Sequence, residues 1–147
     1  MKENIQNPQF DSILNKHLFF KSLSFEDRVL ITQNSNLNIY KKRETIVKEG
    51  EYVSNLIIVL KGFVMIELQN NKNKMILDIL PASSVVGAPL CLTERTYTYS
   101  IISLCECEIL FIDIQTIRNI LLSNARFAFS SIQYFNENFI SPLIQKL

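Results

Sequence analysis

The sequence has few of the residues on which most catalytic and metal sites depend. Its 147 residues include one histidine, three cysteines, three glycines and no tryptophan. A metal-dependent enzyme with imidazole ligands needs two or three histidines around one ion, whereas His17 is alone and is interpreted as a partly exposed helix residue. The sequence also lacks a nucleophile elbow, a Walker-type phosphate loop and a paired-carboxylate signature. We therefore predict that the protein is not an enzyme.

The cysteines are too few and too scattered for a disulfide framework or a structural metal site. Cys91, Cys105 and Cys107 are odd in number, and a reducing cytoplasm would keep them as thiols. A structural zinc site needs four ligands. If Cys105 and Cys107 share a strand, their sulfurs point to the same side and fill the core. We predict no metal and no cofactor.

The chain also lacks a strong charge of either sign and a long apolar run. Fifteen Lys and Arg residues against fourteen Asp and Glu leave a net charge of +1, which provides no field to attract nucleic acid. The longest apolar runs, such as 56–60, fall far short of the roughly 20 residues of a membrane span. The first ten residues are polar, unlike a signal peptide. We expect a cytoplasmic protein without a membrane segment.

Hydrophobic spacing divides the chain into a helical start, a β-rich middle and a helical end. Helical periodicity covers 1–35, where Ser24 and Asp27 resemble a capping box, and it returns over 114–147 after Asp113, a plausible N-cap. Between them, 36–113 shows short apolar runs separated by turns. The predicted strands are 37–41, 45–48, 56–60, 63–68, 75–80, 97–104 and 108–112, with a hairpin loop at 69–73. The fold class is therefore mainly β with flanking helices.

The three glycines each stand at a break between β segments. Gly50 lies in a Glu-Gly-Glu turn, Gly62 follows a lysine twelve residues later, and Gly87 opens the next break. This order, together with 20–24 and 108–112, resembles the cyclic-nucleotide-binding domain of Crp/Fnr-type regulators. The resemblance implies a double-stranded β-helix, that is a jelly-roll-like β-roll, with N-terminal helices and a C-terminal dimerisation-type helix.

The resemblance also points to a ligand cassette, but its two main polar groups are missing. In nucleotide-binding members of the family, backbone N–H groups and an arginine bind the cyclic phosphate, and a glutamate binds the ribose. The glutamate position falls on Ala88 and the arginine position on Tyr97 or Thr98, while Arg95 would serve only if the loop shifted. We predict an unidentified effector other than cyclic nucleotide, with a divergent cyclic-nucleotide receptor as an alternative. The candidate ligand-binding residues are Gly87, Ala88, Pro89, Leu90, Arg95, Tyr97 and Thr98.

The C-terminal segment carries apolar residues at a loose helical spacing that predicts one stripe. Its members are Phe127, Ile132, Phe135, Phe139, Leu143 and Ile144. In the family the corresponding helix pairs with its twin, which makes Ile132, Phe135 and Phe139 candidate homodimer contacts. Alternatively, the stripe packs onto the roll of its own subunit. Pro142 is expected to end or kink the helix at about Ser141.

The functional hypothesis from sequence follows the resemblance. In full-length Crp/Fnr regulators a helix-turn-helix domain follows the dimerisation helix, and this chain stops at Leu147, where that domain would begin. We therefore predict the sensor and dimerisation domain of a transcription regulator, which would reach DNA only through a helix-turn-helix domain absent from the chain. The alternative is a standalone module that acts through protein contacts.

Overall fold

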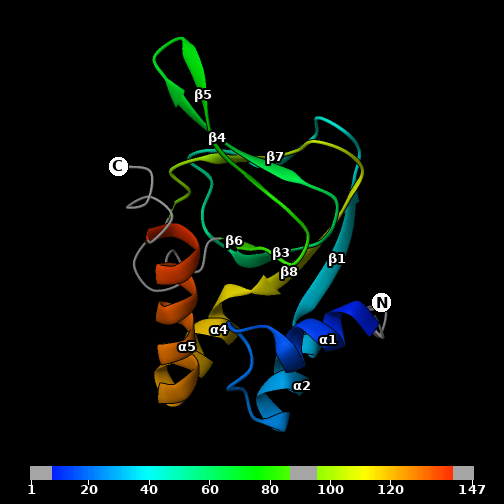
Figure 1. Cartoon of the computed structure of the whole chain (residues 1–147), viewed down its shortest axis with the longest axis vertical. Helices are drawn as coiled ribbons and strands as arrows, with labels where there is room; N and C mark the ends of the chain where they lie inside the picture. The colour runs from blue at the N-terminus through cyan, green and yellow to red at the C-terminus, as the bar shows by residue number, and fades with distance from the viewer. Residues whose placement is uncertain (1–7, 87–95, 141–147) are drawn as a thin grey trace.

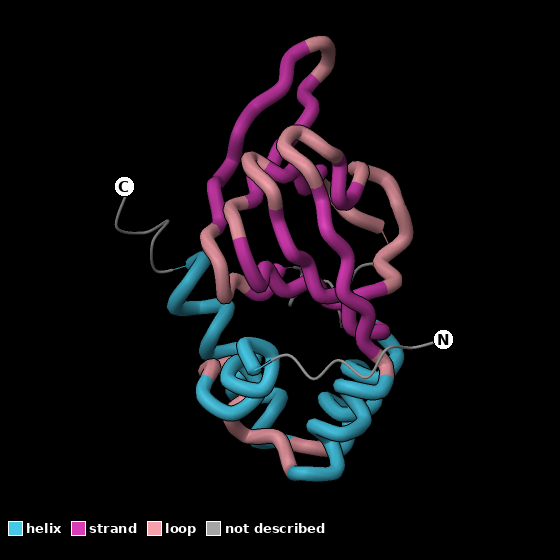
Figure 2. The backbone as a smooth tube through the Cα atoms, turned by 90° about the vertical axis from the view of Figure 1, so that its right-hand side faces the viewer, coloured by secondary structure: helices cyan, strands magenta, loops and turns pink. Residues whose placement is uncertain are grey.

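The computed structural model describes residues 8–86 and 96–140. Helices gather at one end of the molecule and strands at the other (Figures 1 and 2). The helices are α1 (Pro8–Lys16), α2 (Phe25–Gln33), α4 (Ile114–Ser123), α5 (Ala125–Phe135) and a π-helical segment, η1 (Asn136–Ile140). None of the helices in the described part of the chain has the length and apolar character that crossing a membrane requires.

Two antiparallel four-stranded sheets form the β-roll. The first has the order β1 (Ser35–Tyr40), β8 (Cys107–Asp113), β3 (Asn55–Lys61) and β6 (Val85–Val86). The second has the order β2 (Thr45–Val47), β7 (Ser100–Ser103), β4 (Val64–Asn70) and β5 (Asn73–Leu80). Neighbouring strands within each sheet are often distant in sequence, as expected when one chain winds back and forth between two sheets. The predicted fold class is confirmed.

Strand β3 explains the longest apolar run in the sequence. Leu56, Ile57, Ile58, Val59 and Leu60 are all buried, although successive side chains of a strand point to opposite faces. Strand β3 lies inside its sheet, between β8 and β6, and helix α4 contacts it. Both faces are therefore covered, and the run is continuously apolar instead of alternating.

Local hydrogen bonds fix the starts of three helices. Ser24 caps α2 by accepting from the Asp27 N–H at 3.1 Å, and Asp113 caps α4 by accepting from the Thr116 N–H at 3.1 Å. Asn124 caps α5 in the same way, because its Oδ1 accepts from the Phe127 N–H at 3.0 Å. The N-caps that the sequence predicted at Ser24 and Asp113 are confirmed.

Two sequence predictions about the strands were wrong, and one short strand was missed. The strand expected over 97–104 is only β7, and the two-residue strand β6 was not predicted. The hairpin predicted at 69–73 is confirmed, although its turn has only two residues, Asn71 and Lys72, and Asn71 takes a φ of +58°. Asparagine tolerates this left-handed conformation. Cys105 lies in the bend between β7 and β8 and not on a strand with Cys107.

Candidate functional site

The structure places the two ends of the ligand cassette. The candidates Gly87, Ala88, Pro89, Leu90 and Arg95 lie outside the described residues. Strand β6 leads directly into this segment, is fully buried, and pairs with the central strand β3 through Val85–Ile58 and Val86–Ile57. The cassette therefore starts from a strand that is fixed in the first sheet.

Tyr97, one of the two residues at the predicted arginine position, is buried and hydrogen-bonded within the roll. Its side chain is only 3% exposed, and its hydroxyl donates to the Asn55 carbonyl at 3.1 Å. Its backbone N–H donates to the Glu51 carbonyl, and its carbonyl accepts from the Gly50 N–H, both at 2.8 Å. Tyr97 thus fastens the chain beyond the cassette to the Glu-Gly-Glu turn. Thr98, the other candidate, is exposed.

A small cavity lies beside Tyr97. Its volume is about 120 Å³, and the residues that line it include Tyr52, Phe111 and Glu51. Ligand pockets usually measure roughly 300–1,000 Å³, so this cavity alone does not hold a nucleotide. Among its described lining residues Glu51 is the only charged one, and a carboxylate repels a phosphate. The cavity therefore offers no replacement for the missing arginine.

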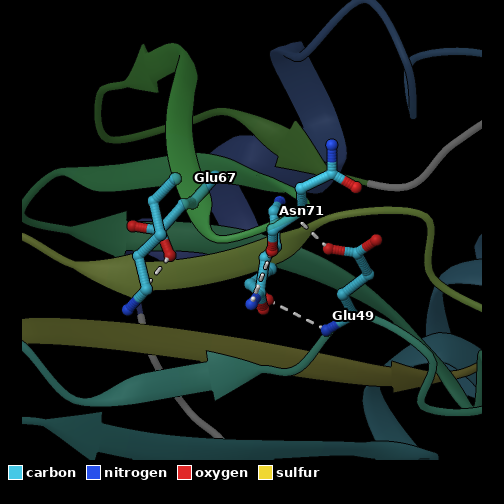
Figure 3. A network of polar contacts seen from close by, with 6 residues as sticks. Glu49, Glu67 and Asn71 are labelled. Atoms are coloured by element: carbon cyan, nitrogen blue, oxygen red, sulfur yellow. Dashed lines mark hydrogen bonds and ion pairs between the residues drawn. The ribbon is translucent and has the colours of Figure 1, made fainter.

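The Glu-Gly-Glu turn is held to the second sheet by a polar network (Figure 3). The Glu49 N–H donates to the Ser100 hydroxyl at 2.9 Å, and the Glu49 carboxylate accepts from the Gln69 N–H at 3.3 Å. Nearby, Lys74 Nζ lies 3.8 Å from Glu67 Oε1. These bonds connect the turn to β7 and to the β4–β5 hairpin, so the side chain of Glu49 contributes to the architecture of the roll.

A protein-family comparison agrees with this architecture. The model of the cyclic nucleotide-binding domain matches residues 37–124, which is more than half of the chain. The chain belongs to the cyclic nucleotide-binding domain family. No curated protein sequence matches it significantly.

Solved structures of similar fold include transcriptional regulators and the regulatory domain of PKA. The sensor domain of the transcriptional regulator DNR from Pseudomonas aeruginosa is 15% identical, with a TM-score of 0.78 over 87% of this chain and 91% of that one. The Thermus thermophilus catabolite activator protein is 16% identical, with a TM-score of 0.70 over 87% of this chain and 61% of that one. The cAMP-bound regulatory domain of Toxoplasma gondii PKA is 18% identical, with a TM-score of 0.72 over 82% of this chain and 46% of that one. This chain therefore spans less than two thirds of the latter two, and at these identities the likeness shows the fold.

This cyclic nucleotide-binding domain keeps its cysteines as packing residues where the structure describes them. The Cys107 thiol donates to the carbonyls of Phe63 and Cys105, each at 3.2 Å, and burial raises the pKa of Cys107 above its ordinary value. Within residues 8–86 and 96–140, no cluster of three or more His, Cys, Asp or Glu side chains is suited to a metal ion. Cys91 lies outside the described residues.

Helix α5 of the domain has two different apolar faces, so the prediction of a single stripe was wrong. Phe127 is fully buried, with its ring centroid 5.3 Å from that of Phe19. Ile132 is 63% exposed, and Phe129, which was not among the candidates, is 70% exposed. Phe135 is half-buried. The three-residue spacing of Phe129 and Ile132 is the sequence signal that marks the exposed face.

Two C-terminal predictions cannot be placed on either face. The Phe139 side chain lies outside the described residues, although its backbone belongs to η1. Pro142 and the rest of 141–147 are also outside them. The exposed apolar face of α5 is therefore defined by Phe129 and Ile132.

Proposed function

We propose that this domain is the sensor and dimerisation domain of a Crp/Fnr-type transcription regulator whose effector is not a cyclic nucleotide. The proposed lack of cyclic-nucleotide binding rests on the burial and hydrogen bonding of Tyr97. The resemblance places a phosphate-binding arginine at Tyr97 or Thr98. The first is a buried tyrosine whose hydroxyl is bonded to the Asn55 carbonyl, and the second is an exposed, uncharged threonine. Ala88, at the ribose-binding position, adds no polar group. In this proposal the domain keeps the fold of the family but lacks the arginine and glutamate side chains that bind the nucleotide.

The regulatory half of the proposal is supported by fold and surface. The DNR sensor domain has the same fold over nearly its whole length, and α5 exposes Phe129 and Ile132 next to each other on one helical face. Burying such a pair against its twin would remove two large apolar side chains from water, each worth about 1.5–3 kcal/mol when fully buried. In the proposed regulator, DNA would be contacted by a helix-turn-helix domain and not by this domain, and the site of action would be the cytoplasm.

A second candidate function, a protein-interaction module, is favoured by strand β5. This strand lies at the edge of its sheet, and its large apolar side chains are about half exposed: Met75, Ile76, Leu77 and Ile79. The hairpin that carries them projects from the roll (Figure 1). Exposed apolar side chains along an edge strand favour a contact with another protein. The two functions differ in which surface associates.

Calorimetric titration tests the proposed lack of nucleotide binding. Cyclic AMP or cyclic GMP added to the domain is expected to give no saturable heat up to about 1 mM, which corresponds to a binding free energy weaker than roughly −4 kcal/mol. The reason is that no described side chain replaces the arginine. Adenosine serves as the control for heats of dilution and stacking. Micromolar binding that is lost in Arg95→Ala would instead show a divergent cyclic-nucleotide receptor.

Sedimentation equilibrium tests the proposed dimer. The unmodified domain is expected to dimerise, and Phe129→Asp should weaken the dimer at least tenfold, because it would place a charge in a desolvated apolar contact. Leu122→Asp is the matched control, since Leu122 is 82% exposed on α4 and outside the α5 face. A domain that stays monomeric, or a dimer that resists Phe129→Asp, would contradict dimerisation through α5.

A further inference from the structure

Two backbone groups favour one neutral tautomer of His17. It lies immediately beyond the end of α1, and its Nδ1 accepts from the Phe19 N–H at 3.1 Å. Its Nε2 lies 2.9 Å from the carbonyl oxygen of Ser83, which can only accept. Nε2 must therefore carry the hydrogen while Nδ1 is bare, which is the neutral imidazole. His17 is partly exposed, as predicted, and directly follows the last residue of α1, where its N–H still donates to the Ile13 carbonyl at 2.9 Å.

The turn that His17 holds is the entrance to the cassette. Ser83 has a φ of +74°, a conformation that is uncommon for residues other than glycine. Its N–H donates to the Val59 carbonyl at 2.7 Å, and the Val59 N–H donates to the Ser84 carbonyl at 3.0 Å. Strand β6 follows at once and leads to Gly87. The bond from His17 to Ser83 therefore helps to hold a strained turn that sets the starting point of the cassette.

Tyr134 reaches the same place from helix α5. Its hydroxyl accepts from the Val85 N–H at 3.1 Å, two residues beyond the carbonyl that His17 binds. The rings of Tyr134 and His17 are in contact, with centroids 5.0 Å apart. Tyr134 is buried, and burial raises the pKa of its hydroxyl, which stays neutral. Two touching side chains from separate helical regions thus hold Ser83 and Val85.

The structure assigns to His17 and Tyr134 the role of positioning residues that couple strand β6, which leads to the candidate cassette, to helix α5. This inference rests on the proposed sensor function and names the route by which the sensor acts. A shift of β6 that accompanies effector binding would move the Val85 N–H and the Ser83 carbonyl, and with them both side chains. Helix α5 changes from α to π geometry two residues after Tyr134, at Asn136. Such π segments occur frequently at functional sites, so α5 is well placed to change its pose at this point.

Protonation of His17 gives a way to perturb this coupling without knowing the effector. A proton on Nδ1 would face the Phe19 N–H, so this bond would be lost. Among the described residues, the ring contacts the Phe19 N–H, the Ser83 carbonyl and the rings of Phe20 and Tyr134, and of these groups only Tyr134 titrates. Lys16, on the same segment, is exposed. Burial lowers the pKa of His17 below its ordinary value, so the bond should be lost as the pH falls below about 6.5.

The test is an NMR pH titration of the ¹⁵N-labelled chain from about pH 7.5 to 5. The amide signals of Phe19, Ser83 and Val85 should shift with one midpoint below about 6.5, and so should signals of 131–135 in α5. In Tyr134→Phe, which retains the ring, the amide signals of Phe19 and Ser83 should still shift with the protonation of His17. The signals of α5 should no longer shift with that midpoint. The Val85 amide should also exchange about tenfold faster, since it has lost its acceptor.

Two further variants separate coupling from a general structural effect. His17→Gln should abolish the shared transition at every site, and Tyr40→Phe, in a tyrosine on β1 that contacts Phe111, should leave it unchanged. If α5 signals do not titrate in the unmodified chain, or titrate equally in Tyr134→Phe, the coupling is refuted. Neither outcome depends on an effector, a dimer or DNA. The proposed function and this inference can therefore fail independently.

Discussion

Gly62→Ala should destabilise the domain by about 3 kcal/mol or more. Gly62 has a φ of +92°, where a Cβ costs roughly 1–2 kcal/mol. A Cβ at this position would also lie 2.7 Å from both the Cys107 sulfur and the Glu106 carbonyl oxygen. One of these is backbone and the other is a buried side chain, so neither can yield cheaply, and overpacking typically adds about 1–3 kcal/mol. The loss is a large share of the roughly 5–15 kcal/mol by which domains are stable.

Urea denaturation followed by circular dichroism measures this loss, and the chain supplies its own control. Gly50 has the same φ of +92°, but a Cβ there would meet nothing within 4 Å. Gly50→Ala should therefore cost only the backbone strain, about 1–2 kcal/mol. The difference between the two variants isolates the close approach of Gly62 to the β7–β8 bend. Equal losses would show that this contact is not tight.

What the sequence could predict was encoded locally. The apolar runs of β3 and β8 and the caps at Ser24 and Asp113 depend on residues within a few positions of each other, and all four lie where they were expected. Hydrophobic periodicity and cap chemistry act at this range. The glycine positions added the order of the turns, which is enough to recognise the roll.

The errors arose where distant contacts decide the outcome. Alternation extends smoothly through Tyr97 and Tyr99, but the chain there is tied to the Glu-Gly-Glu turn nearly fifty residues earlier and does not form a strand. Strand β6 is too short to produce a pattern and exists because β3 offers it a pairing edge. No local signal reports either constraint.

The candidate site shows the same division. The sequence alone identified the two missing polar groups at Ala88 and Tyr97, because that inference needs only the residue type at a position. It could not show that the Tyr97 hydroxyl is bonded to Asn55, or that His17 reaches Ser83 across the fold. These bonds join segments more than forty residues apart. They show that the residues around the candidate site support the fold, which the residue types alone do not reveal.

Phe127→Ala should destabilise the domain by about 3–5 kcal/mol, while Phe129→Ala should change the stability of the monomer by less than about 0.5 kcal/mol. The two phenylalanines are on one helix, two residues apart, but Phe127 is fully buried and Phe129 is 70% exposed. The Phe127 ring meets Phe19 edge-on and stacks on Phe20 at 6.3 Å. Its removal would leave a cavity in the layer between α5 and the N-terminal segment.

Thermal unfolding at several protein concentrations separates the two roles of the helix. Because dimerisation stabilises the folded state by mass action, the Tm of a dimer rises with concentration. Phe127→Ala should lower the Tm at every concentration, whereas Phe129→Ala should remove the rise and leave the low-concentration value unchanged. If Phe129→Ala lowers the Tm as much as Phe127→Ala even when the protein is dilute, both rings pack within one subunit. Helix α5 would then serve only the core of its own roll.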